Sequence, residues 1–260
     1  MKIANYDTDL TDAQWAYLKP LLPKISKRGR PPKDRRRLID AILYLVKCGC
    51  PWRYLPADFP NWKTVYHLFR QWVAHNQWAV IHDTLRVLVR RRHDNRSRPT
   101  AAILDRQSVK SAGHGGAVGY DAAKQIKGRK RHLLMDTLGR VLGVAVTPAN
   151  VTERDGAQLL LARGLGWFTW LRILWVDGGY TGEAFAQWVK RLRPKLAVAV
   201  VKRSDGTKGF TVLPRRWVGE RTFGWLMRHR RLVRDYETTE SSAQAWIYIA
   251  MIRIRLRRLA

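Results

Sequence analysis

The sequence predicts an α/β fold in which a mixed sheet with helices on its faces follows a small all-helical domain. Apolar residues recur with a helical period through about the first 92 residues. From about residue 98 the spacing of apolar residues changes, and short apolar runs of strand length alternate with helical segments. A chain of 260 residues is long enough for one medium domain with a smaller companion. We therefore expect a helical domain at residues 1–92 and an α/β domain at residues 98–260.

The charge balance points to a polyanionic partner. Lys and Arg number 49 against 20 Asp and Glu, which gives a formal net charge of +29. Such an excess costs self-repulsion unless a partner neutralises it, and phosphate neutralisation supplies most non-specific affinity for nucleic acid. A membrane surface fits less well, because the basic residues are spread along the chain and no apolar run reaches transmembrane length. The apolar content of 46% excludes a disordered basic tail.

The N-terminus and the cysteines indicate an intracellular protein without a zinc site. The first residues contain no hydrophobic signal core, and we expect a cytoplasmic location. The two cysteines, Cys48 and Cys50, lack further ligands at zinc-binding spacing, so we expect reduced thiols.

Three helices are expected in the first domain. Thr11 and Gln14 form a capping-box pattern ahead of the first helix, and residues 36–49 form the second, which ends at a glycine. The third begins at a capping asparagine and spans Asn61–His75. Three short amphipathic helices in a basic protein suggest a helix-turn-helix with Asn61–His75 as recognition helix. The alternative is a helical bundle used only for protein contacts.

Three loops rich in basic residues or glycine leave alternatives open. Residues 28–33, RGRPPK, suit an A·T-rich minor groove or a solvated linker about equally. Residues 113–119, GHGGAVG, lack the Gly-Lys-Ser/Thr of a phosphate-binding loop and predict a connector. Residues 124–132, KQIKGRKRH, predict either a solvated charged face or a surface that faces DNA.

The order of elements after residue 98 predicts a ribonuclease-H-like mixed sheet. Three strands, a helix, a strand, a helix, a strand and a final helical part follow one another, and the second and third strands form a hairpin around a Leu-Gly turn. The strands are expected at residues 101–105, 131–149 (the hairpin), 171–176 and 196–201, and the helices at residues 153–165, 181–192, 215–232 and from Ser241 onward.

Three carboxylates stand out because the other acids fit caps, turns or polar helix faces. Asp105 ends the first apolar run, Asp177 ends the fourth, and Glu220 lies in the helix after the fifth. The first and fourth strands are parallel neighbours in this fold, so their ends would bring the two aspartates together. Clustered carboxylates repel one another unless cations bridge them, and oxygen-only ligands suit Mg²⁺ or Mn²⁺. The alternative is three unrelated caps and surface acids.

The motifs around these acids resemble those of bacterial insertion-sequence transposases of the DDE class, of the IS-four and IS-five kind. The resemblance is carried by ILDRQSVKS, GYDAAKQIKGRKRH, WVDGGYTG and RRWVGERTFGWLMRHRRLVRDYE, and by LTDAQWAYLKPLLP near the N-terminus. It implies that Asp105, Asp177 and Glu220 bind two Mg²⁺ ions, with Mn²⁺ as a substitute. It also implies cleavage at the ends of an insertion sequence and transfer of the freed 3′-hydroxyl to target DNA, without a covalent protein intermediate.

The third motif departs from the family pattern. Arg216 stands four residues before Glu220 as the family requires, but Met227 occupies the position of the expected lysine, and Arg228 or Arg231 would replace it. Leu213 occupies the position of the expected tyrosine.

We expect double-stranded DNA as the partner, namely the terminal inverted repeats and the target, bound by a dimer. Tyr180 and Trp225 would stack on an unpaired base or pack in the core. The alternative functions are a stand-alone metal-dependent nuclease and a non-catalytic DNA-binding regulator. The expected DNA contacts are Arg28, Arg30, Lys63, Tyr66, Arg70, Lys127, Arg129, Lys130, Arg131, Tyr180, Arg216, Arg221, Arg228 and Arg231.

Overall fold

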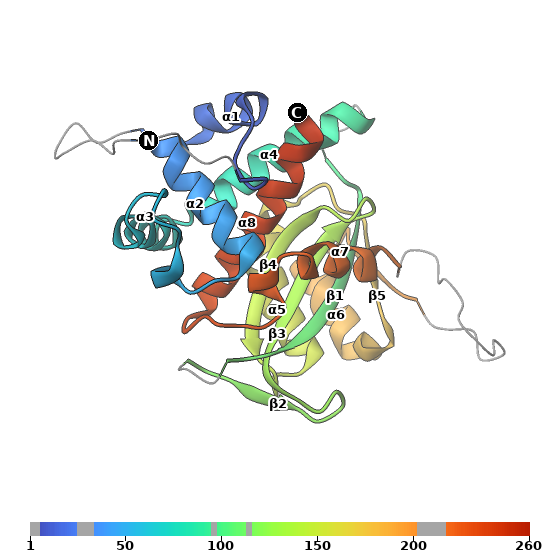
Figure 1. Cartoon of the computed structure of the whole chain (residues 1–260). Helices are drawn as coiled ribbons and strands as arrows, with labels where there is room; N and C mark the ends of the chain where they lie inside the picture. The colour runs from blue at the N-terminus through green and yellow to red at the C-terminus, as the bar shows by residue number, and fades with distance from the viewer. Residues whose placement is uncertain (1–5, 25–33, 95–97, 113–115, 202–216) are drawn as a thin grey trace. The chain divides into compact units, whose positions relative to one another are not determined.

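The computed structural model describes residues 6–24, 34–94, 98–112, 116–201 and 217–260 (Figure 1). The chain forms two compact units, which we describe separately. Unit 1 comprises residues 1–95, 226–233 and 241–260, and unit 2 comprises residues 96–225 and 234–240. No helix in these described ranges is long and apolar enough to cross a membrane.

Unit 1 contains the three expected helices. Helix α1 (Asp12–Leu18) begins with the capping box of Thr11 and Gln14. Helix α2 (Arg35–Cys48) is capped by Asp34 and ends at Gly49, whose φ of 73° lies in the left-handed region that glycine favours. Helix α3 (Trp62–Ala74) begins where the Asn61 side chain accepts a hydrogen bond from the Lys63 amide. Capping signals therefore placed the starts of α1 and α3, and apolar periodicity placed the start of α2, each within two residues.

Two further helices complete unit 1. Helix α4 (Gln77–Asp94) follows α3 directly and had not been predicted as a separate element. Helix α8 (Glu240–Leu259) had been assigned to the second domain, but residues 241–260 belong to unit 1. Trp246 of α8 stacks on Phe69 of α3 with ring centroids 4.6 Å apart, and Arg255 donates a hydrogen bond of 2.7 Å to the His82 carbonyl of α4. Three short 3₁₀ turns also belong here: η1 (Lys19–Leu21), η2 (Trp52–Tyr54) and η5 (Arg230–Leu232).

Unit 2 is built on a six-stranded mixed sheet (Figure 1). The strands run in the order β2-β3-β1-β5-β6, and β4 also pairs with β3. β1, β2, β3 and β4 pair antiparallel, whereas β1, β5 and β6 are parallel neighbours. This is the expected ribonuclease-H-like arrangement. The bounds are β1 (Ala101–Lys110), β2 (Gly119–Asp121), β3 (Ile126–Asp136), β4 (Val141–Pro148), β5 (Ile173–Val176) and β6 (Ala197–Val200).

Helices α5 (Glu153–Gly164) and α6 (Glu183–Leu192) bury apolar side chains against one face of this sheet. Leu160 of α5 and Phe185 of α6 share one core cluster with Leu104 of β1 and Leu174 of β5. Helix α7 (Trp217–Met227) contacts the β3–β4 turn, where the Thr222 hydroxyl donates to the Gly139 carbonyl. The short turns η3 (Leu165–Trp167) and η4 (Gly178–Tyr180) flank β5.

The hairpin β3–β4 is closed by the predicted turn residue. The Asp136 carboxylate accepts hydrogen bonds of 2.9 Å from the amides of Leu138 and Arg140. Gly139 has a φ of 76°, which only glycine adopts without strain. The prediction of a Leu-Gly turn is therefore confirmed, while the three-residue strand β2 was too short for its pattern to show.

The second half of the basic run of residues 124–132 is an internal part of the sheet, whereas Lys124 and Lys127 in its first half are exposed. Arg129, Lys130 and Arg131 lie on β3 and are 1%, 6% and 2% exposed. Arg129 pairs with Asp235, and Lys130 donates to the Val151 carbonyl. The expectation that these three side chains contact DNA is wrong for this conformation, because their charged groups contact the protein.

Candidate active site

Asp105 and Asp177 lie at matching positions on adjacent parallel strands. The register pairs Ala101 with Ile173 and Ile103 with Trp175. When this register is extended by two residues, Asp105 of β1 stands beside Asp177, which directly follows β5. Neighbouring strands lie about 4.8 Å apart, so the two aspartates lie side by side on the sheet. Both line a small cavity whose other walls are Ile103, Leu104, Trp175, Val176 and Val201.

Backbone amides hold each of these carboxylates. The Arg106 amide donates to Asp105 Oδ1 at 2.7 Å, and the Gly179 amide donates to Asp177 Oδ1 at 2.9 Å. Asp177 also caps the 3₁₀ turn η4. It is therefore a turn-former as well as a member of the acidic pair. Asp105 lies in the middle of β1, because the strand continues through polar residues to Lys110.

Glu220 lies on α7, one residue beyond a close contact with Asp105. A side chain at Gly219 would overlap Asp105 Oδ2, so α7 approaches this carboxylate with its first turn. The Glu220 side chain itself is exposed. Among the described residues, no group of three or more His, Cys, Asp or Glu is arranged to hold a metal ion. The structure thus brings the two aspartates together, with α7 beside them, but does not gather all three carboxylates.

An ion pair beside the two aspartates was not foreseen. Arg106 of β1 pairs with Glu153 in the first turn of α5. A side chain at Gly179 would overlap Glu153 Oε2 and would lie 3.2 Å from Asp177 Oδ1. Glu153 is one of the acids that the sequence assigned to caps, turns or polar helix faces. Its contact with the loop after β5 depends on strand order, which the local sequence does not reveal.

The charges of Asp105 and Asp177 affect the pKa of two further side chains, Lys124 and Tyr180. Burial lowers the pKa of Lys124, as does Arg106, while Asp121, Asp105 and Asp177 act in the opposite direction. Burial raises the pKa of Tyr180, and the two aspartates add to this shift. Tyr180 is 1% exposed and packs against Phe185 in the core, so it is not available to stack on DNA.

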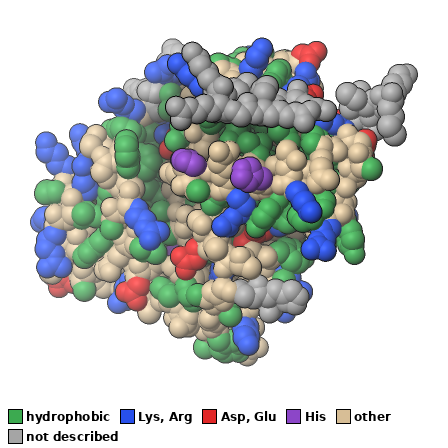
Figure 2. Space-filling model, turned by 90° about the vertical axis from the view of Figure 1, so that its left-hand side faces the viewer, with side chains coloured by type: hydrophobic (Ala, Val, Ile, Leu, Met, Phe, Trp, Pro, Cys, Tyr) green, Lys and Arg blue, Asp and Glu red, His purple; other side chains and the backbone are tan. Residues whose placement is uncertain are grey.

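The remaining expected DNA contacts differ in exposure. Lys63, Tyr66 and Arg70 are exposed along α3, although Arg70 donates to the Ser242 hydroxyl. Lys127 and Arg228 are exposed, whereas Arg231 is buried against Trp52 and Trp246. Figure 2 shows Lys and Arg side chains at many places on one face. Arg221 stacks on Trp217 and Trp225, and Arg28, Arg30 and Arg216 lie outside the described residues.

A ribonuclease-H-like sheet with two aspartates at matching positions of adjacent parallel strands is typical of metal-dependent enzymes that cut and join nucleic acids. Comparison with known proteins narrows this class. Residues 96–255 match the family described as "Transposase DDE domain", and residues 10–82 match "Putative transposase of IS4/5 family". The chain therefore belongs to the DDE transposases of the IS4/5 kind.

Two curated relatives are similar to parts of the chain, and the first is named as a protein of an insertion element. The "Insertion element IS402 uncharacterized 16.2 kDa protein" of Burkholderia cepacia is 30% identical over 117 residues, which cover 42% of this chain and 78% of that protein. "Uncharacterized protein y4sN" of Sinorhizobium fredii (strain NBRC 101917 / NGR234) is 30% identical over 82 residues, which cover 31% of this chain and 63% of that protein.

Proposed function

We propose that the chain binds the terminal inverted repeats of an insertion sequence, cleaves at the element ends and joins the freed 3′-hydroxyl to target DNA. The observation that carries this proposal is the shared register of Asp105 and Asp177 on β1 and β5. Two carboxylates so close together repel each other unless a proton or a cation lies between them. Their chemistry fits a divalent cation, because oxygen ligands are those that Mg²⁺ and Mn²⁺ prefer.

Asp105 and Asp177 would hold the cation from two sides, and Glu220 would complete the set. Two bound ions would activate the attacking oxygen and stabilise the leaving oxygen of the phosphodiester. The Glu220 side chain extends from the first turn of α7, whose backbone already packs on Asp105. A change of its rotamer when DNA binds would turn it toward the pair.

The protein groups around Asp105 and Asp177 would hold the two carboxylates in place while DNA is bound. The Arg106 and Gly179 amides fix the two carboxylates, and Glu153 balances the charge of Arg106.

The proposed reaction has two steps. In the first step an oxygen of water bonds to phosphorus and the bond to the 3′ oxygen breaks, which leaves a 3′-hydroxyl. In the second step that hydroxyl bonds to a target phosphorus, and the bond between that phosphorus and its leaving oxygen breaks.

Helix α3 is the proposed recognition helix of the terminal repeats. Lys63, Tyr66 and Arg70 are spaced three and four residues apart, which places them on one exposed face. A helix with this face suits the major groove, where its side chains reach base edges and phosphates. Because both element ends must be cut together, we propose a dimer as the working form.

Substitution of Asp177→Asn tests the catalytic assignment. The neutral amide keeps the size and the hydrogen bond from Gly179, but loses the charge that binds a cation. We expect strand cleavage to fall by about a hundredfold to a thousandfold, as for loss of one group that stabilises charge in the transition state, while affinity for the element end stays within about twofold. The matched control is Asp155→Asn on the exposed first turn of α5, which should cleave normally.

The readout is a map of the cuts on both strands of an element end in Mg²⁺, in Ca²⁺ and in chelator. Cleavage in Mg²⁺ with transfer to target DNA supports the transposase. Cleavage without any transfer would favour the stand-alone nuclease, and specific binding without cleavage would favour the regulator. Robust cutting in chelator would contradict the cation site.

A further inference from the structure

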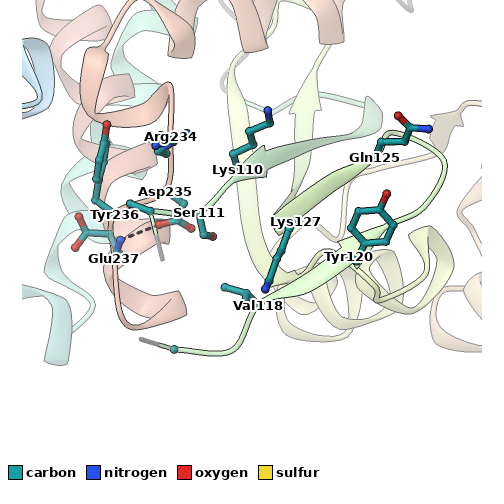
Figure 3. A pocket seen from close by; sticks show the side chains of 12 residues that line it. Lys110, Ser111, Val118, Tyr120, Gln125, Lys127, Arg234, Asp235, Tyr236 and Glu237 are labelled. Atoms are coloured by element: carbon teal, nitrogen blue, oxygen red, sulfur yellow. Dashed lines mark hydrogen bonds between the residues drawn. The ribbon is translucent and has the colours of Figure 1, made fainter. Parts of the chain in front are cut away.

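A second cavity of unit 2 has walls that share no residue with the cavity of the aspartate pair. Its volume is about 460 Å³, within the usual range for small-molecule sites. One wall comes from the end of β1, from β2 and from the start of β3, and the other from residues 234–237 (Figure 3). Among the lining residues are Lys110, Ser111, Tyr120, Lys127, Arg234 and Tyr236.

A buried arginine joins the two walls. Arg129 donates to the Ala117 carbonyl at 3.0 Å on one side, and to the Glu237 and Thr238 carbonyls at 2.8 and 3.1 Å on the other. The backbone closes the floor, because the Asp235 amide donates to the Lys110 carbonyl at 2.9 Å. These bonds fix the cavity before any ligand arrives, so little ordering has to accompany binding.

The rim combines cations with exposed aromatic rings. Lys110, Lys127 and Arg234 are exposed, and Tyr120 and Tyr236 expose 55% and 48% of their surface. In Figure 3 the two tyrosines stand on opposite walls with Lys127 between them.

The charged side chains of the lining leave the cavity positive, because Lys110, Lys127 and Arg234 outnumber Glu237 and Asp235. The Asp235 carboxylate in the wall is neutralised by Arg129 at 3.4 Å. The Ser111 hydroxyl is buried and makes no hydrogen bond within the described part of the chain.

We propose that this cavity binds one unpaired nucleotide of a DNA strand. The base would stack on Tyr120 or Tyr236, the flanking phosphates would contact Lys110, Lys127 and Arg234, and the Ser111 hydroxyl would bond the sugar or base. Aromatic rings next to cations bind single strands regardless of sequence, since every base has a flat face. A base that stays paired in a duplex cannot enter the cavity, so the ligand is a base that has left the stack, and an overhanging end presents such a base without the cost of unpairing. The inference rests on the proposed function only in that DNA is the substrate.

The test compares duplexes that end blunt with duplexes that carry a single-stranded overhang. Affinity is measured by fluorescence anisotropy in chelator, so that cleavage plays no part. The wild type should prefer the overhang. At least one of Tyr120→Ala and Tyr236→Ala should weaken overhang binding about tenfold, as expected for loss of one stacked base, and both should leave blunt binding unchanged. Tyr120→Phe and Tyr236→Phe should restore the preference, because the ring is retained. Trp167→Ala removes an exposed ring of the same unit outside the cavity and should have no effect.

Charge is tested through the salt dependence. Lys110→Ala and Lys127→Ala should each lower the slope of log K against log salt for the overhang by about 0.7. Lys190→Ala, on the exposed side of α6, should not. Equal affinity of the alanine and phenylalanine variants for overhangs would overturn the proposal. So would displacement of the overhang by an acidic peptide as effectively as by a single strand of equal charge.

The outcome is separable from that of the proposed function. A protein that prefers overhangs but never cleaves would contradict the transposase assignment alone. A protein that cleaves element ends while its tyrosine variants bind overhangs normally would contradict the nucleotide cavity alone.

Discussion

At the scale of single residues, the charge around Asp105 and Asp177 depends on the pair of Arg106 and Glu153. The side chains of Arg106 and Glu153 are only 15% and 19% exposed. Removal of one partner leaves the other partly buried and unpaired, which costs more than the pair itself contributes.

A double-mutant cycle tests this pair. Arg106→Gln and Glu153→Gln should each lower the free energy of unfolding by about 2 kcal/mol. The double variant should lose clearly less than the sum of the two, as measured by urea denaturation. Additive losses would mean that the two side chains do not depend on each other. Cleavage by Glu153→Gln should also fall, because its carboxylate packs on the loop that holds Asp177.

The buried imidazole of His132 predicts that the protein loses stability in acid. It is buried on β3 beside the Thr147 hydroxyl. Burial lowers its pKa to about 4, and the nearby Lys130 and Arg106 act in the same direction. In the unfolded chain the His132 imidazole binds a proton near pH 6.5, whereas in the folded chain it stays neutral down to about pH 4. The free energy of unfolding is therefore highest above pH 6.5 and falls as the pH is lowered toward 4.

The loss should amount to about 3 kcal/mol for a shift of this size. Hydrogen exchange of the β3 amides at neutral pH and at pH 4.5 measures it, because exchange reports on unit 2 directly. His132→Gln keeps a hydrogen-bonding group without a titrating one, and should flatten the dependence. An equally steep pH dependence in this variant would assign the acid loss to other groups.

At the scale of elements, the approach of α7 to the sheet requires a glycine. Gly219 faces the Asp105 carboxylate, whereas Gly224 on the same helix has no neighbour within 4 Å of an added methyl group. Gly224→Ala should therefore stabilise the helix by up to about 1 kcal/mol. Gly219→Ala adds the same methyl group but must displace Asp105 or the helix.

We expect Gly219→Ala to reduce cleavage at least about a hundredfold, since displacement of a catalytic group by about 1 Å has that effect. Its circular dichroism should remain that of a folded chain, and Gly224→Ala should cleave normally. Equal activity of the two variants would mean that α7 does not set the position of Asp105.

The elements themselves were largely predictable from local patterns. Caps gave the starts of α1 and α3, apolar periodicity gave α2, and apolar runs gave β4, β5 and β6. Helix α4 was missed because it follows α3 after a break too short to show as a loop. The extent of β1 was missed because its polar half carries no alternating pattern.

The environment of the candidate site was less predictable. Arg129 is buried because Asp235 and Glu237, more than 100 residues later, meet it in the fold. The ion pair of Arg106 with Glu153 likewise depends on the order of the strands in the sheet, which the local sequence does not reveal. The pairing of Asp105 with Asp177 was foreseen only because strand order was inferred first.

At the scale of the whole molecule, the chain is not two consecutive domains. Unit 1 is completed by residues 226–233 and 241–260 from the far end of the sequence. Within unit 1, Trp246 packs on both Phe69 and Trp52, and Arg253 donates to the Asp7 carbonyl. Residues 241–260 therefore have to be synthesised before unit 1 can close.

Deletion of residues 1–95 should consequently unfold more than the segment removed. The remaining chain would expose one whole helix, α8, whose buried residues include Trp246, Ile249, Ile252 and Leu256. Each such side chain loses about 2 kcal/mol of burial free energy. We expect residues 96–260 alone to aggregate in size-exclusion chromatography. When residues 1–95 are co-expressed as a separate chain, the two pieces should elute together and recover cleavage of element ends. A monomeric, cooperatively unfolding fragment 96–260 would mean that α8 does not depend on the N-terminal helices, and the chain could then be treated as two independent domains.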